Sequence, residues 1–155
     1  MEINRWTFIK QITGCAFLAF FPVSQNMIMN TQGIIIRTSP YGVKETIDRL
    51  VIFLEKHGST VYSRINQQNE VRHTGREIPP VEFILFGNPA KGGAIMAANP
   101  LAALDLPLKI LAWETEDEVV KVAFNDPAYI KYRYSLPAKL TASLDIGPLL
   151  EKALA

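Results

Sequence analysis

The feature that most constrains the fold is the stretch of residues 83–107, where an apolar run ends in a turn and a second apolar run follows a segment of small residues. Gly87 and Asn88 tolerate the backbone angles of a tight turn, and Pro89 suits the first position of a helix. The continuous apolar run is typical of a strand that is buried on both faces. The stretch therefore predicts, in order, a strand over residues 81–86, a loop over residues 87–93, a helix, and a strand over residues 106–113.

The strongest helical pattern lies in residues 43–57. Its apolar residues recur at the spacing that places them on one face of a helix: Val43, Ile47, Leu50, Val51 and Leu54. Gly58 follows directly, and glycine commonly ends a helix.

Shorter patterns complete the chain. Asp126 and Pro127 are typical of an N-cap and the first helical residue. Alternating or β-branched residues predict strands over 33–38, 59–65 and 119–124, and helices are predicted over 128–134 and 144–154. Residues 66–74 are either a short exposed helix or a loop, and residues 135–143 show no assignable pattern. The order predicts an α+β two-layer sandwich in a single domain, with helices packed on one face of a mixed β-sheet.

The N-terminal segment has the layout of a secretory signal. Arg5 and Lys10 precede an uncharged apolar run, residues 12–23, which polar residues follow. The run is shorter than the roughly 20 residues that a spanning helix needs. We expect residues 1–26 to be a signal peptide and the mature chain to be periplasmic or extracellular. Two alternatives remain: residues 12–23 anchor the chain in the membrane, or the segment packs on the domain.

Composition excludes several kinds of site. The 155-residue chain has a net charge of +1, and the charges of residues 31–155 balance, which argues against a nucleic-acid partner. Cys15 is the only cysteine and lies in the N-terminal apolar run, so the body has no disulfide and no cysteine-based zinc site. His57 and His73 are the only histidines and lack metal-ligand spacing. We therefore expect no metal and no cofactor.

The loop over residues 87–93 is the first place to look for a ligand. A strand, a glycine-rich loop and a helix N-terminus can form an anion cradle from exposed N–H groups, and Lys91 lies nearby. The loop matches neither the P-loop nor the dinucleotide-binding pattern, and the same residues also suit a turn and a helix start. The candidate ligand-binding residues are Gly87, Asn88, Lys91, Gly92, Gly93, Asn99, Asp105 and Asp126. The last three are equally typical of caps and turns.

Three functions remain open. The first is a binding module for a small anionic ligand. The second is an enzyme with Asp105 or Asp126 as general base and Lys91 holding an anionic substrate. The third is an interaction protein that uses an apolar surface. No catalytic residue is assigned, because the chain carries no complete catalytic constellation.

Several motifs occur together in the order of a known family. They are Phe86-Gly87-Asn88-Pro89, then Met96 with Asn99-Pro100 and Ala103-Leu104-Asp105-Leu106-Pro107, then Asn125-Asp126-Pro127 with Tyr129. With these motifs, residues 33–155 resemble the DUF302 family. The resemblance implies a compact two-layer α/β domain that is homodimeric and often carries an export signal. It implies no activity.

Overall fold

The computed structural model describes residues 32–155, so the predicted signal peptide lies outside the described residues. Five strands form one sheet with the spatial order β1-β5-β4-β3-β2. They are β1 (Ile34–Thr38), β2 (Thr60–Asn66), β3 (Val81–Gly87), β4 (Leu108–Glu114) and β5 (Val120–Asn125). The α+β two-layer sandwich is confirmed.

The expectation of a mixed sheet is wrong, because every neighbouring pair of these strands is antiparallel. A strand, a helix and a strand open the described domain, an order that often produces two parallel neighbours. Here β3, β4 and β5 lie between β1 and β2, so the two strands joined by the first helix form opposite edges of the sheet.

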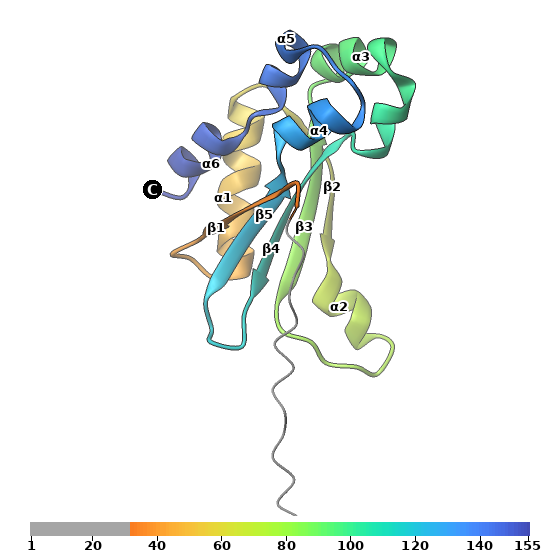
Figure 1. Cartoon of the computed structure of the whole chain (residues 1–155). Helices are drawn as coiled ribbons and strands as arrows, with labels where there is room; N and C mark the ends of the chain where they lie inside the picture. Colours follow the sequence, from red (N-terminus) through yellow and green to blue (C-terminus); the bar gives the residue numbers. More distant parts are fainter. Residues whose placement is uncertain (1–31) are drawn as a thin grey trace, which may run out of the picture.

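Most of the helices lie on one face of the sheet and at one of its ends, and one short helix, α2 (Gln67–Arg72), lies at the opposite end (Figure 1). The helices are α1 (Val43–Lys56), α2 (Gln67–Arg72), α3 (Pro89–Ala98), η1 (Pro100–Leu104), α4 (Pro127–Arg133), α5 (Ala138–Thr141), η2 (Ala142–Leu144) and α6 (Gly147–Ala153). Helix α1 lies behind the sheet in the view of Figure 1, while α3, α4 and α5 gather at its upper end. No helix among the described residues is long and apolar enough to cross a membrane.

The core lies between α1 and the inner face of the sheet. Ile47, Leu50 and Leu54 of α1 are completely buried, as the helical spacing predicts. They belong to one apolar cluster with the inward-facing residues of the strands, among them Ile84 and Ile110. Burial of a side chain of this size contributes about 1.5–3 kcal/mol to folding, so this layer supplies most of the stability of the domain.

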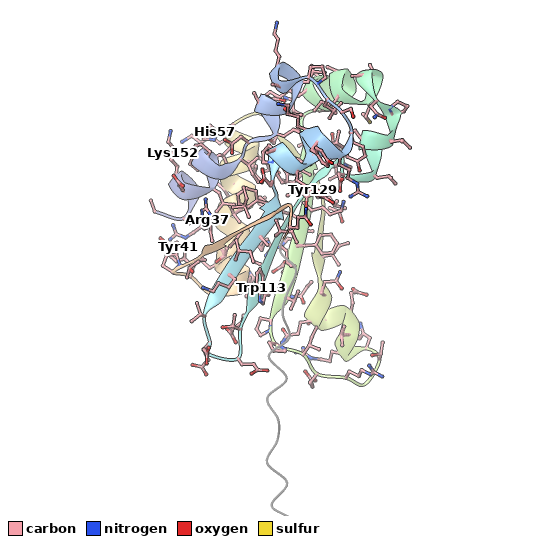
Figure 2. All side chains as sticks on the ribbon, in the orientation of Figure 1. Arg37, Tyr41, His57, Trp113, Tyr129 and Lys152 are labelled. Atoms are coloured by element: carbon pink, nitrogen blue, oxygen red, sulfur yellow. The ribbon has the colours of Figure 1, made fainter. Side chains whose placement is uncertain are left out.

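The opposite face of the sheet carries a row of apolar residues that crosses all five strands. The register pairs them in the order Ile36, Ala123, Leu111, Phe83 and Ile65. Each is partly exposed. Trp113 lies on this face next to the row (Figure 2). In the described part of the chain, this sheet face therefore carries a continuous apolar row that is partly open to solvent, with Lys109 and Lys121 beside it.

Candidate functional site

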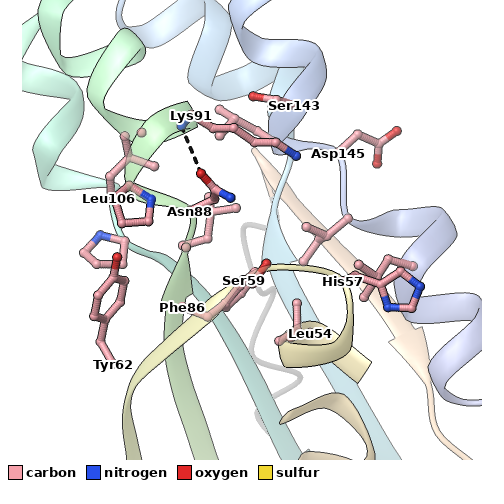
Figure 3. A pocket seen from close by; sticks show the side chains of 18 of the residues that line it. Leu54, His57, Ser59, Tyr62, Phe86, Asn88, Lys91, Leu106, Ser143 and Asp145 are labelled. Carbon is pink, nitrogen blue, oxygen red and sulfur yellow. Dashed lines mark hydrogen bonds between the residues drawn. The ribbon is translucent and has the colours of Figure 1, made fainter. Parts of the chain in front are cut away.

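A pocket of about 210 Å³ opens at the end of the sheet where β3 ends and β4 begins. Because neighbouring strands are antiparallel, the end of α1 and the start of β2 lie at the same end of the sheet. The segment that joins η2 to α6 forms the remaining wall. Four separate parts of the chain thus meet around one cavity (Figure 3).

The walls of the pocket are mostly apolar. Leu54 and Phe86 line it from α1 and β3, and Leu144 and Ile146 line it from the C-terminal segment. All four are buried. Their positions are set by the core rather than by the pocket, so the apolar surface is held in place without a ligand.

The turn after β3 is closed by Asn88. Its side-chain oxygen accepts hydrogen bonds from the N–H groups of Ala90 at 3.0 Å and Lys91 at 3.2 Å. The N–H of Gly92 donates to the Asn88 carbonyl at 2.9 Å, and Pro89 has no N–H. The first turn of α3 therefore has no N–H group left for an anion, which is a physical reason to prefer the turn-and-cap interpretation of this loop over the cradle.

Asn88 also joins two parts of the pocket wall. Its side-chain amide donates to the carbonyl of Gly58 at 3.0 Å, which connects the β3–α3 turn to the turn after α1. The oxygen of the Asn88 side chain thus bonds to the β3–α3 turn and its amide nitrogen bonds to the turn after α1. These hydrogen bonds fix the distance between the two turns.

Two charged side chains line the pocket, Lys91 and Asp145. Neither belongs to an ion pair formed within residues 32–155. One oxygen of Asp145 accepts from the N–H of Gly147 at 3.0 Å. Figure 3 shows the two side chains along one side of the pocket, with Leu54 and Phe86 opposite them.

His57 lines the pocket from the end of α1. Its Nδ1 lies 2.7 Å from the carbonyl oxygen of Phe53, so Nδ1 carries the proton and donates. The imidazole also stacks on the Phe53 ring, with the ring centroids 4.2 Å apart. His57 thus contacts a carbonyl of the last helical turn, and its Nε2 is left without a proton when the ring is neutral.

The predicted ligand residues divide into two groups. Gly87, Asn88, Lys91 and Gly92 line the pocket. Gly93, Asn99, Asp105 and Asp126 do not. Asp126 lines a separate shallow hollow beside α4 and caps that helix, with its carboxylate accepting from the N–H of Ala128 at 2.8 Å. The structure does not bring the predicted residues into one cavity.

Asp105 joins η1 to α4 instead. Its carboxylate accepts hydrogen bonds from the Tyr134 hydroxyl at 2.6 Å, from Arg133 at 3.3 Å and from the Asn125 amide at 3.4 Å. Asn99 strengthens the same junction, because it donates to the Tyr134 carbonyl at 2.9 Å and caps η1. Burial of Tyr134, and then its hydrogen bond to Asp105, raise the pKa of the tyrosine above its ordinary value. Several residues of the family motifs thus hold two helical segments together.

Sequence reasoning missed part of the pocket. Ser59, Tyr62, Ser143 and Asp145 line it as well. They lie far from residues 87–93 in the chain and match no motif. Asp145 was predicted to lie at the start of a helix over residues 144–154, but it follows η2 directly and α6 begins only at Gly147. Among the described residues, no group of three or more His, Cys, Asp or Glu could hold a metal ion.

Comparisons with known proteins agree with this fold. The family described as "Domain of unknown function DUF302" matches residues 35–154. A crystal structure of an uncharacterized conserved DUF302 protein from Bacillus stearothermophilus is similar, with a TM-score of 0.67 and 21% sequence identity over 79% of this chain and 95% of that one. At that identity the likeness concerns the fold.

Curated relatives also match. A fluoride-specific ion channel FluC 1 of Brucella suis biovar 1 (strain 1330) is 36% identical over 104 residues, which are 67% of this chain and 41% of the relative. FluC 2 of Brucella melitensis biotype 1 (strain ATCC 23456) has the same identity over 38% of its length. The chain thus spans about two fifths of the length of these relatives. The family match covers nearly all of the described residues, so this chain belongs to the DUF302 family.

Proposed function

We propose that this domain is a binding module for a small ligand, which enters the pocket beside the β3–α3 turn. The observation that carries the proposal is a preformed pocket of about 210 Å³ with buried apolar walls and a few polar groups. Small-molecule sites in proteins typically combine these two properties, since the apolar walls supply affinity and the polar groups supply orientation.

The volume limits the size of the ligand. A closed apolar cavity of about 150 Å³ holds a benzene molecule. On that scale, 210 Å³ accommodates roughly eight non-hydrogen atoms, and the open side lets a polar end reach solvent. A nucleotide or a larger cofactor would leave most of its atoms outside the pocket.

The pocket favours binding over catalysis. A nucleophile in an enzyme is held by a general base at hydrogen-bond distance. Here the hydrogen bonds of His57 and Ser143 go to backbone carbonyls, and that of Asp145 comes from a backbone N–H. A carboxylate-dependent enzyme remains the second hypothesis. Its two predicted bases, Asp105 and Asp126, lie outside the pocket, and their carboxylates accept hydrogen bonds from neighbouring helical segments.

Two adjacent glycines of α3 offer a matched test. A Cβ added to Gly92 or to Gly93 meets no atom within 4 Å, and only Gly92 lines the pocket. Leucine at either position should stabilise the helix by a similar amount, about 1 kcal/mol, because glycine disfavours helical structure. Gly92→Leu should also block the pocket, and Gly93→Leu should not.

The measurement is a thermal-shift screen of small anions, amino acids and carboxylates against the full chain and both variants. We expect at least one compound that raises the Tm of the full chain and of Gly93→Leu but not of Gly92→Leu. The proposal fails if no compound raises the Tm, or if the two variants respond alike to every compound that does.

We further propose that two copies of the domain pair through the open sheet face. The apolar row that crosses the five strands supports this, because monomeric proteins rarely expose a continuous apolar face. Light scattering of the full chain should give the mass of a dimer, and Leu111→Lys, in the middle of the row, should give a monomer. Val119→Lys, in the β4–β5 turn, should leave the mass unchanged. A monomeric full chain would contradict the pairing.

We also propose that the chain is exported and that residues 1–26 are removed. The charge and hydropathy pattern of the segment supports this. Mass spectrometry of the protein from producing cells should give a chain that begins near residue 27. A membrane-bound chain of full mass would indicate an anchor instead.

The names of the curated relatives describe a fluoride channel, but this chain spans only about two fifths of those proteins. The proposed binding function therefore rests on the pocket alone.

A further inference from the structure

The charges at the pocket define the chemistry of its ligand more closely. Among residues 32–155, Lys91 and Asp145 are the only acidic and basic side chains that line it, apart from His57 at the end of α1. Both are exposed, and within the described residues neither has a charged partner. The pocket thus presents one positive group and one negative group beside an apolar floor (Figure 3).

A ligand with a single charge suits this arrangement poorly. A carboxylate would be attracted by Lys91 and repelled by Asp145. A protonated amine would be attracted by Asp145 and repelled by Lys91. The backbone could not compensate a carboxylate, because Asn88 already engages the N–H groups at the start of α3. A ligand that carries both charges complements both side chains at once.

The apolar walls and the volume set the rest of the ligand. Leu54, Phe86 and Ile146 offer a buried surface that only an apolar group matches. Building on the function proposed above, we infer that the pocket takes an apolar amino acid as a zwitterion. Its carboxylate pairs with Lys91, its ammonium group pairs with Asp145, and its side chain fills the apolar floor. Leucine has nine non-hydrogen atoms, which is close to the roughly eight that the cavity volume accommodates, since its two charged groups lie toward the open side.

Four probes separate the parts of this ligand. L-leucine carries all three groups, 4-methylpentanoate lacks the ammonium group, 3-methylbutylamine lacks the carboxylate, and glycine lacks the apolar side chain. Titration calorimetry of the full chain at neutral pH should show the tightest binding for leucine. The loss of either charged group should weaken binding about tenfold, as expected for one charge-assisted hydrogen bond in a partly solvated site.

Charge-removing variants test the two contacts separately. In Lys91→Met, 3-methylbutylamine should bind at least as tightly as leucine, because the partner of the carboxylate is gone and Asp145 repels it. In Asp145→Asn, 4-methylpentanoate should bind at least as tightly as leucine, and the asparagine oxygen still accepts from the N–H of Gly147. The matched controls are Lys109→Met on the open sheet face and Asp117→Asn in the β4–β5 turn, both exposed and outside the pocket. They should leave the order of the four probes unchanged.

The possible outcomes distinguish this inference from the function on which it rests. Binding of 4-methylpentanoate as tight as that of leucine overturns the zwitterion, and so does a variant in which the probe order does not change. Absence of binding by all four probes also overturns it. If Gly92→Leu still abolishes a thermal shift produced by some other compound, the binding module stands and only the ligand class is wrong.

Discussion

Asp105→Ala is expected to lower the free energy of unfolding by about 3 kcal/mol. The carboxylate accepts from Tyr134, Arg133 and Asn125, and a hydrogen bond to a charged group contributes about 1.5–3 kcal/mol. Tyr134 is only 4% exposed, so its hydroxyl would lose its partner inside the protein. Urea unfolding of the full chain, followed by circular dichroism, measures the change.

Two variants show whether the hydrogen bond carries the effect. Asp117→Ala, in an exposed turn, should change stability by less than about 0.5 kcal/mol. Tyr134→Phe combined with Asp105→Ala should cost less than the sum of the single changes, because both remove the same contact. Strict additivity of the two changes would show that Asp105 acts elsewhere.

The same contact gives a pH dependence. The folded protein raises the pKa of Tyr134, so its contribution to stability is complete below the ordinary tyrosine pKa of about 10 and is lost as the pH rises above it. Above pH 10 the unfolded chain ionises this tyrosine while the folded protein still keeps it neutral. Between pH 9 and 11, Tyr134→Phe should therefore lose less stability than the unaltered chain. An equal or steeper decline in the variant would contradict the assignment.

Gly33→Ala is expected to cost about 3 kcal/mol. Gly33 has a φ of 77°, a conformation that costs other residues roughly 1 kcal/mol or more. A Cβ at this position would lie 2.4 Å from Cγ of the Tyr129 ring, so the ring would have to move. Urea unfolding again measures the change. Figure 2 shows Tyr129 beside the start of β1.

Gly75 is a matched control for the clash. Its φ is 81°, and a Cβ there would meet nothing within 4 Å, so Gly75→Ala should show the backbone cost alone, about 1 kcal/mol. Tyr129→Ala should recover part of the loss in the Gly33→Ala background. If Gly33→Ala and Gly75→Ala lower the free energy of unfolding equally, the Tyr129 ring moves aside at no measurable cost.

The sequence predicted α1 and the five strands well, but the predicted loop over residues 87–93 was wrong, because α3 already begins at Pro89. Helix α1 was predicted to within one residue, since four turns provide enough apolar positions to reveal the period. Helices α5 and η2 have four and three residues, too few for any period to show. The antiparallel sheet could not be predicted, because strand direction depends on which strands lie between β1 and β2, and no local pattern records that.

The site was predicted only in part, because one residue type can fit two roles and because the fold brings distant residues together. An asparagine at position 88 fits both an anion cradle and a helix cap. Only the position of its side-chain oxygen, which accepts from the N–H groups of Ala90 and Lys91, shows that it is a cap. Asp105 likewise suits a general base and a half-buried hydrogen-bond acceptor. Asp145 could not be found at all, because the fold, and not the chain, brings it beside Lys91.

The strand order also decides when the sheet can close. Strands β2, β3, β4 and β5 are neighbours both along the chain and in space, so each can pair with the strand synthesised just before it. Strand β1 is synthesised first of the five but pairs only with β5, Ile34 opposite Asn125. During translation, β1 therefore waits for its partner until β5 has left the ribosome. Such long-range pairing slows folding, and this domain can complete its fold only near the end of synthesis.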